Sequence, residues 1–251
     1  MGRDYTISRR NAVALASATA AGIDVVLVTG RPLRWLGPAY DQLAAAYPTI
    51  CANGAVDYDP ATDLIRQTRP LPPSVLTDVC TRLAATLPGI AFAAEIDGGR
   101  RMLHEPAYPA RWESADSGAS EAPLSELVAQ PAVKLLARSD ELGADRLAAM
   151  VETAVAGRVE VTHSSFSGLV EMSATGVTKG TGLAAHSERL GIKPDDVLAF
   201  GDMPNDVPML RWAGRGVAVA NAHPAAWTVA DDHTLSNVDD GVAVYLERLL
   251  G

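Results

Sequence analysis

The stretch GDMPNDVPML, at residues 201–210, brings two carboxylates and an amide close together after a short apolar run. Asp202 and Asp206 are four residues apart, and Asn205 lies between them. Neighbouring carboxylates repel one another, so they stay ionised only where a cation or a set of hydrogen-bond donors offsets their charge. Hard oxygen ligands of this kind suit Mg²⁺. The alternative is structural, because Asp202 or Asn205 could simply cap the helix that follows.

Three other stretches carry polar groups that suit an anion. Thr29, Gly30 and Arg31 follow an apolar run and precede a helical pattern, where a hydroxyl and backbone N–H groups can bind a negative charge. Lys179 lies in GVTKGTGL, whose glycines let the backbone approach a ligand, and Asn53 is followed by a glycine at a third strand end. Each stretch alone has a structural reading, as a turn, a helix cap or a solvated lysine. In combination they provide what phosphoryl transfer requires.

The pattern around these residues predicts an α/β fold that brings them together. Apolar runs at residues 23–28 and 197–200 are typical of parallel strands buried on both faces. Helical patterns at 9–21 and 33–46, and a short strand at 49–52, give the alternating order of a doubly wound sheet. Open sheets of this type bind ligands at the carboxyl ends of their strands. We therefore expect the polar stretches to meet at one edge of a parallel-sheet core.

The middle of the chain has a different pattern. Prolines at positions 70, 72 and 73 mark a boundary, and hairpin signals alternate with helical segments beyond it. This pattern predicts an α+β insert with an antiparallel sheet at residues 72–174. The core domain would then comprise residues 1–71 and 175–251.

The composition narrows the class of protein. The 251 residues are 48% hydrophobic and carry a net charge of −9, which argues against a general nucleic-acid binder but not against phosphorylated substrates. Cys51 and Cys80 lack metal-ligand spacing, so we interpret both as reduced thiols. The sequence shows neither an apolar run of membrane length nor an apolar signal core near Met1. We expect a cytoplasmic protein without a membrane partner.

In order and spacing, these motifs resemble the haloacid dehalogenase superfamily, in its Cof-type sugar-phosphatase-like branch. The resemblance is carried by ISRRNAVALASATAAGIDVVLVTGR, ICANGA, GVTKGTGL, GDMPNDVPML and LSNVDDGVAVYLERLL. It implies a Rossmann-like core with the insert as a cap domain. It also implies Mg²⁺-dependent hydrolysis of a small phosphorylated metabolite through an aspartyl-phosphate. We expect a monomer or weak homodimer.

The resemblance also implies roles for individual residues. Asp202 would ligate Mg²⁺, Asp206 would support the metal site, and Lys179 would neutralise the phosphate and the nucleophile, so these three count as catalytic. A wider set would bind phosphate or substrate: Thr29, Gly30, Arg31, Asn53, Lys179 and Asn205. Three cap residues are candidate substrate contacts: Glu95, His104 and Trp112.

One part of the family pattern has no match. The family's nucleophile is the first aspartate of an Asp-x-Asp-Gly-Thr motif that ends a mid-sheet strand just before the stretch ISRR. Asp4 is followed by Tyr5 and Thr6, so it does not fit. We expect negligible phosphatase activity from this chain, and core strands that lack a neighbour. Two alternatives stay open, a non-catalytic phosphometabolite-binding protein and a sugar phosphomutase.

Overall fold

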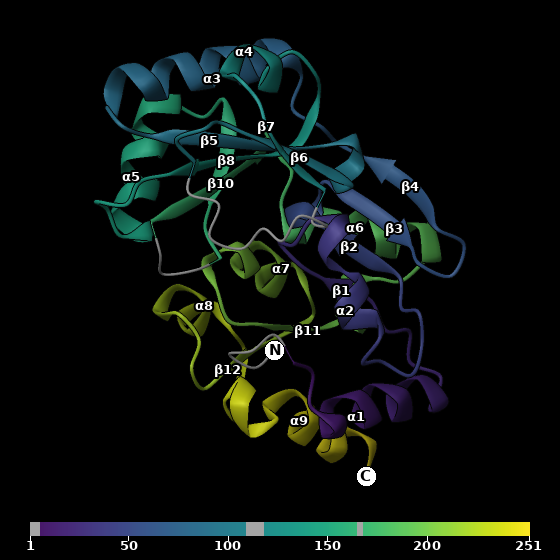
Figure 1. Cartoon of the computed structure of the whole chain (residues 1–251). Coiled ribbons are helices and arrows are strands. Elements are labelled where there is room, and N and C mark those ends of the chain that lie inside the picture. The colour runs from purple at the N-terminus through teal and green to yellow at the C-terminus, as the bar shows by residue number, and fades with distance from the viewer. Residues whose placement is uncertain (1–5, 109–117, 165–167) are drawn as a thin grey trace.

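The computed structural model describes residues 6–108, 118–164 and 168–251. The described strands form three sheets, two in the core and one in the insert (Figure 1). The parallel pairing in both core sheets, with helices between the strands, confirms the predicted α/β class. Within these ranges, no helix is both long enough and apolar enough to cross a membrane.

The first core sheet has the order β1-β2-β3-β4. Its strands are β1 (Leu27–Val28), β2 (Thr49–Cys51), β3 (Val56–Asp59) and β4 (Leu64–Thr68). β1 and β2 are parallel, whereas β3 and β4 form antiparallel pairs. The second core sheet is parallel throughout and consists of β11 (Leu198–Gly201), β12 (Arg215–Val219) and β13 (Asp232–Thr234). The core helices are α1 (Arg9–Ala20), α2 (Gly37–Tyr40), α6 (Lys179–Leu190), α7 (Val207–Trp212), α8 (Pro224–Val229) and α9 (Gly241–Leu250).

The two core sheets border one hydrophobic cluster without sharing a hydrogen-bonded ladder. Val28 of β1 and Ala199 of β11 both contact this cluster. In the described part of the chain, β1 pairs only with β2, and β11 pairs only with β12. One edge of each strand is therefore without a strand partner. Such edges offer unpaired backbone groups to an incoming strand.

Two predicted elements are shorter than expected. The strand predicted over residues 23–28 is reduced to β1, and Ile23 before it is 41% exposed. A strand that pairs on one side makes only half of the ladder hydrogen bonds of a central strand. The apolar run is therefore held less firmly in an extended conformation. The helix predicted over residues 33–46 is a 3₁₀ turn, Leu33–Trp35, followed by the four-residue α2. The Gly37-Pro38 pair explains this break, because proline cannot continue a preceding helix.

The first and last core helices lie side by side at the end of the molecule opposite the insert (Figure 1). Ser8 caps α1 through a bond from the Asn11 N–H (3.1 Å), and its hydroxyl donates to Asp240 Oδ1 (2.5 Å). The Asn11 side chain accepts a bond from the Ala243 N–H (2.9 Å) in α9. These polar contacts fix the two ends of the described core against each other.

The insert is a six-stranded sheet with three helices on one face (Figure 1). In spatial order its strands are β7 (Ala119–Glu121), β6 (Arg101–His104), β5 (Ala91–Ile96), β8 (Ala132–Arg138), β10 (Leu169–Ala174) and β9 (Val159–Thr162). The helices are α3 (Pro73–Thr86), α4 (Leu124–Leu127) and α5 (Ala144–Val155). The chain enters this unit at Leu71, which bridges to Ala132. The domain limits at residues 72 and 174 stay a prediction.

The two faces of this sheet differ in chemistry. Phe92, Leu135 and Val170 point toward the helices and join their buried side chains in the largest cluster. Each such buried side chain stabilises the fold by about 1.5–3 kcal/mol. Since side chains alternate along a strand, neighbouring residues point toward the core instead. Among these are Lys134 and Glu171, which are only 3% and 4% exposed.

Candidate functional site

The predicted polar residues meet around Gly30, which directly follows Thr29 at the end of β1. A Cβ atom on Gly30 would lie 2.8 Å from Asn53 Oδ1, 3.2 Å from Asn205 Nδ2 and 3.3 Å from Glu171 Oε2. At distances below 3.0 Å something must shift, and Asn53 Oδ1 is held by its bond from Asn205, so an added Cβ would disturb this contact. Three segments that are far apart in the sequence therefore crowd against one backbone position. We name the group Thr29, Gly30, Asn53, Lys179, Asp202, Asn205 and Asp206 the strand-end site.

The loop after β1 is held by its own backbone and by the loop after β2. The Thr29 hydroxyl accepts a bond from the Arg31 N–H (3.1 Å) and keeps its own proton as a donor. The Thr29 carbonyl accepts from the Asn53 N–H (3.2 Å), and the Arg31 carbonyl accepts from the Ala52 N–H (2.9 Å). A hydroxyl donor is thus fixed at the end of β1, beside the Gly30 backbone. Arg31 contributes its backbone groups to this arrangement.

Asn53 links the core to the insert. Its backbone is left-handed (φ 57°, ψ 31°), a conformation that asparagine tolerates better than most residues. The side chain is 2% exposed, and its Oδ1 accepts from Asn205 Nδ2 (3.0 Å). Its Nδ2 donates to Glu171 Oε2 (2.5 Å) in β10. Both ends of the amide are therefore committed, one to the core and one to the insert.

Asp206 organises the loop after β11. Its Oδ2 accepts the backbone N–H groups of Asp202 (2.9 Å) and Met203 (3.0 Å). Its Oδ1 accepts from Lys179 Nζ (2.5 Å) at the start of α6, where Thr178 and Thr181 form a capping box. The Asp206 carboxylate is 3% exposed, and both of its oxygens are used. Its role here is to shape the loop and to hold the lysine.

Asp202 and Asn205 have the features expected of metal-binding groups. Burial raises the pKa of Asp202, and the nearby charge of Asp206 adds to this effect although Lys179 opposes it. A cation would offset that repulsion and favour the ionised form. Asn205 Oδ1 is buried without a hydrogen-bond partner in the described part of the chain. A buried acceptor of this kind calls for a donor or a cation. This donor set, made of hard oxygens, fits Mg²⁺.

The insert supplies three functional candidates that sequence reasoning missed: Lys134, Ser164 and Glu171. Lys134 Nζ donates to the Gly30 carbonyl (2.5 Å) and lies 3.3 Å from Glu171 Oε2. Ser164 Oγ donates to Glu171 Oε1 (2.5 Å). Burial by itself would raise the pKa of Glu171, but the charge of Lys134 and the bonds from Ser164 and Asn53 lower it below its usual value. For Lys134 and Glu171 the available signal was a charged residue that interrupts an apolar stretch of a strand.

The three predicted substrate contacts of the cap differ in where they lie and what they contact. Glu95 is 1% exposed and pairs with Arg34 of the core, with its Oε1 3.0 Å from Arg34 Nη2. His104 is buried, and its Nδ1 lies 3.0 Å from the Glu105 carbonyl oxygen. Trp112 lies outside the described residues, as does Asp4. Glu95 thus serves as a second tie between insert and core, at the 3₁₀ turn that follows the loop after β1.

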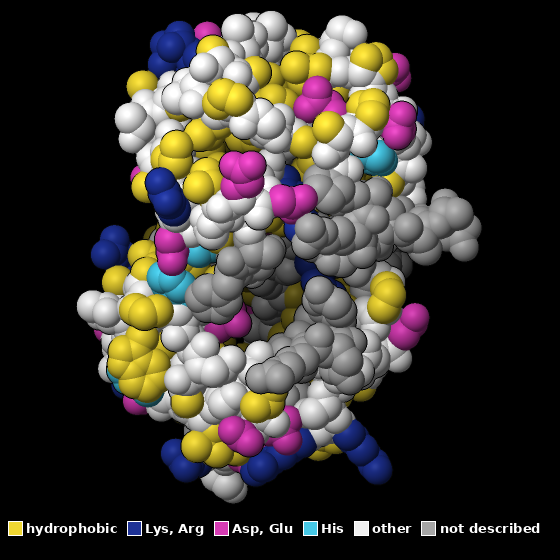
Figure 2. All heavy atoms as spheres, turned by 60° about the vertical axis from the view of Figure 1, so that its left-hand side comes forward, with side chains coloured by type: hydrophobic (Ala, Val, Ile, Leu, Met, Phe, Trp, Pro, Cys, Tyr) yellow, Lys and Arg dark blue, Asp and Glu magenta, His cyan; other side chains and the backbone are white. Residues whose placement is uncertain are grey.

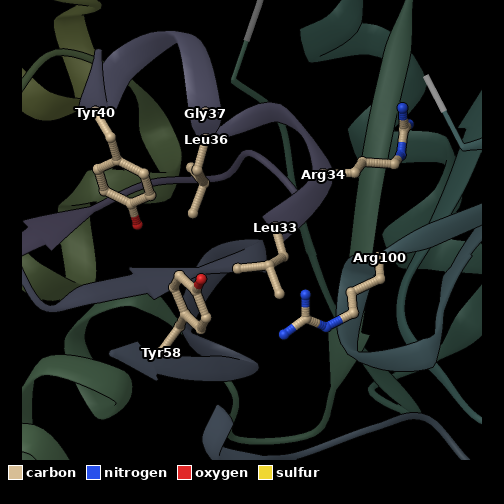
Figure 3. Close-up of a pocket in the computed structure, with 7 residues that line it drawn as sticks. All are labelled: Leu33, Arg34, Leu36, Gly37, Tyr40, Tyr58 and Arg100. Carbon is tan, nitrogen blue, oxygen red and sulfur yellow. The ribbon is translucent and has the colours of Figure 1, made fainter. Parts of the chain in front are cut away.

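A cavity of about 250 Å³ lies elsewhere, between α2, β3 and the insert. Figure 3 shows the residues that line it: Leu33, Arg34, Leu36, Gly37, Tyr40, Tyr58 and Arg100. The Arg34 side chain points away from the two tyrosines (Figure 3) toward its partner Glu95, and Arg100 pairs with Asp63 (2.7 Å). Both lining cations are therefore neutralised by carboxylates. None of the lining residues belongs to the strand-end site, so we place the chemistry at the latter.

Comparison with known proteins agrees with this fold. A sequence model of the haloacid dehalogenase-like hydrolases matches residues 1–246. The phosphoglycolate phosphatase of Methanopyrus kandleri is 45% identical over 94 residues, an alignment that covers 38% of this chain and only 40% of that protein. The 5-amino-6-(5-phospho-D-ribitylamino)uracil phosphatase YitU of Bacillus subtilis is 25% identical over 249 residues, covering 98% of this chain and 92% of the relative.

A solved structure shares the architecture. The haloacid dehalogenase-like hydrolase from B. subtilis superimposes with a TM-score of 0.82 at 23% identity, covering 99% of this chain and 95% of the other. At that identity the likeness shows the fold, whereas the sequence model shows the family. Since it spans nearly the whole sequence, the chain belongs to the haloacid dehalogenase-like hydrolase family, in its Cof-type branch.

Proposed function

We propose that this fold carries a Mg²⁺-dependent phosphatase site for small phosphorylated metabolites, with the insert as its cap. The observation that carries the proposal is the strand-end site itself. A fixed hydroxyl, a glycine backbone and a buried lysine meet a carboxylate with a raised pKa and an amide oxygen that has no partner among the described residues. The family and the names of the relatives support the reaction class.

Each residue of the site has a task in this proposal. The Thr29 hydroxyl and the Gly30 N–H bind oxygens of the substrate phosphate. Lys179, oriented by Asp206, neutralises the charge that develops on those oxygens. Asp202 and Asn205 would hold the Mg²⁺ ion, with Asp206 behind them. When bound, the metal supplies positive charge to the transferring phosphoryl group.

The cap would choose the substrate and exclude water. Lys134 and Glu171 lie above Gly30 and are both nearly fully buried. An incoming phosphorylated molecule would lie at the strand ends beside these two residues, because Lys134 and Glu171 already contact Gly30 and Asn53 directly. Water exclusion strengthens every charge interaction at such a site. The relatives act, by their names, on phosphoglycolate and on a phosphorylated ribitylamino-uracil, which supports a small sugar-phosphate-like substrate class.

The nucleophile is a separate part of the proposal. The 251 residues contain no Asp-x-Asp-Gly-Thr stretch. β1 and β11 each have an edge without a strand partner in the described structure. A strand ending in this motif and added at those edges would place its aspartate beside Thr29 and Asp202. We therefore expect the chain by itself to bind phosphate and to turn over phosphate esters negligibly. The missing motif equally favours a second function, binding of a phosphometabolite without catalysis.

The test is binding of inorganic phosphate in the presence of Mg²⁺, followed by calorimetry. Lys179→Met should weaken binding by at least about 10-fold, since a charge-assisted hydrogen bond is worth about 1.5–3 kcal/mol. Lys193→Met, which removes an exposed lysine, is the matched control and should bind as wild type does. Equal phosphate affinity in Lys179→Met would contradict the assigned site. Rapid hydrolysis of p-nitrophenyl phosphate that Asp202→Asn abolishes would show that a nucleophile is already present.

A further inference from the structure

A second group of metal-binding side chains lies away from the strand-end site, where the insert meets the core. Asp145 is in the first turn of α5, His163 follows β9, and His223 is the N-cap residue of α8. One ligand atom from each of these residues lies within 4.8 Å of the other two. Two imidazoles and a carboxylate therefore converge from three elements. We propose that they bind a divalent transition-metal ion of the zinc type, which fastens the insert to the core.

The distances suit a small tetrahedral ion. Asp145 Oδ1 lies 3.0 Å from His163 Nε2 and 3.4 Å from His223 Nε2. In a tetrahedral zinc site with bonds of about 2.0–2.1 Å, neighbouring ligand atoms are about 3.3 Å apart. The two imidazole rings stand at 80° with centroids 5.8 Å apart, so they do not stack. Two nitrogens and one oxygen are a borderline donor set, which favours zinc over Mg²⁺.

The two histidines of the cluster are largely buried, whereas its carboxylate is exposed to solvent. The His163 side chain is 5% exposed and that of His223 13%, whereas that of Asp145 is 71% exposed. An ion can enter past the carboxylate and meet imidazoles that are already held in place. A fourth position would be left for water, as in zinc sites with three protein ligands. Figure 2 shows histidine and acidic side chains next to each other between the upper and lower parts of this face.

Metal binding requires both imidazoles to move the Nε2 proton that each directs at Asp145 Oδ1, because an ionised carboxylate only accepts. His223 Nδ1 accepts a bond from the Ala225 N–H (3.1 Å), so its neutral ring carries the proton on Nε2 and can donate it to Asp145. To ligate a metal through Nε2, the ring must carry that proton on Nδ1, which breaks the bond from Ala225. That bond lies at the exposed start of α8, where water can replace it. Two metal–nitrogen bonds and a metal–carboxylate bond would then replace the two contacts between Nε2 atoms and Asp145 and the exposed bond from Ala225.

The cluster is connected to the strand-end site through the backbone of His223. The His223 N–H donates to the carbonyl of Asp202 (2.7 Å), while Asp145 and His163 belong to the insert. An ion shared by these three residues ties the insert to the loop that carries Asp202. It therefore restricts separation of the two parts and holds the site closed.

The experiment titrates the whole chain with Co²⁺ in excess Mg²⁺ and follows the visible absorption band of tetrahedral Co²⁺. We expect one equivalent to bind, and Zn²⁺ to displace it. Asp145→Asn should weaken Co²⁺ binding by more than about 10-fold, because even groups that only support a ligand change metal affinity by about 10–100-fold. Asp145 is exposed, so this variant keeps the fold. His163→Gln should have the same effect.

Two control variants separate the cluster from other metal ligands. His233→Gln removes an exposed histidine that stacks on Trp227, and Asp202→Asn removes the carboxylate of the strand-end site. Both should keep the Co²⁺ band. Zn²⁺ should also raise the melting temperature of wild type but not of Asp145→Asn. Absence of the band in wild type, a band that Asp145→Asn leaves unchanged, or a band that Asp202→Asn abolishes would each overturn the proposal.

Discussion

Replacing Glu171 with glutamine tests whether the insert is fastened to the core by a buried ionic network. Three donors converge on its two oxygens: Asn53 Nδ2, Ser164 Oγ and Lys134 Nζ. A glutamine oxygen can still accept from Asn53 and Lys134 while its NH₂ group donates to the Ser164 hydroxyl, so the substitution removes chiefly the negative charge. Lys134, which is 3% exposed, would also lose its only carboxylate partner among the contacts described here.

The size of the effect follows from these contacts. Breaking a buried ion pair by removing one partner costs about 3–5 kcal/mol. Lys134 keeps its bond to the Gly30 carbonyl, so we expect a loss near the lower end, about 3 kcal/mol. For a chain of this length, each kcal/mol shifts the melting temperature by about 2–4 °C. Glu171→Gln should therefore melt about 6–12 °C below wild type.

The assay is a thermal melt by circular dichroism of five proteins: wild type, Glu171→Gln, Lys134→Met, the double variant and one control. Glu152→Gln, an exposed glutamate on α5, is the matched control and should melt with wild type. The double variant Glu171→Gln with Lys134→Met should be more stable than Glu171→Gln alone, because it no longer buries an unpaired charge. If Glu171→Gln melts within 2 °C of wild type, or if the two substitutions add, the ionic tie between insert and core does not exist as described.

Three further predictions address neighbouring contacts. Gly30→Ala should weaken phosphate binding at least about 10-fold and destabilise the fold by about 1–3 kcal/mol, because its Cβ would lie 2.8 Å from Asn53 Oδ1; wild-type affinity by calorimetry would contradict this. Asp206→Asn should lower the melting temperature more than Asp195→Asn, an exposed control, because it removes the carboxylate that is hydrogen-bonded to buried Lys179; equal melts would count against it. Because the folded-state pKa of Glu171 is lowered from 4.5, its stabilisation is present above pH 4.5 and is lost as the pH falls through the lowered pKa. Wild-type melting temperature should thus fall more steeply below pH 4.5 than that of Glu171→Gln; parallel curves would refute this assignment.

Motif spacing was enough to predict which core residues meet. Thr29, Asn53 and Asn205 each follow an apolar run, and parallel strands bring such ends together. The structure places the side chains of Asn53 and Asn205 within 3.0 Å, as that reasoning requires. Spacing could not separate the tasks of Asp202 and Asp206, since both are acidic residues in one loop. Only the structure shows that Asp206 accepts the backbone N–H groups of its own loop, whereas the pKa of Asp202 is raised.

The contacts between insert and core could not be predicted from the sequence. Lys134 and Glu171 each interrupt an apolar stretch of a strand, which marks them as unusual. Their pairing depends on the register of β8 against β10 and on how the sheet faces Gly30. The same holds for Asp145 and His163, which are 18 residues apart and meet through tertiary packing. For the cysteines, burial raises the pKa of both thiols to about 12, in keeping with the predicted reduced state.

The most direct test of the central claim is a Mg²⁺ titration by calorimetry, with and without inorganic phosphate. We predict millimolar affinity for Mg²⁺ alone, about −4 kcal/mol. Phosphate at Thr29 and Lys179 should tighten Mg²⁺ binding, and linkage requires Mg²⁺ to tighten phosphate binding by the same factor. Asp202→Asn should abolish the Mg²⁺ signal, whereas the exposed control Asp239→Asn should keep it. If Asp202→Asn binds Mg²⁺ as well as wild type does, the loop after β11 is only a helix cap.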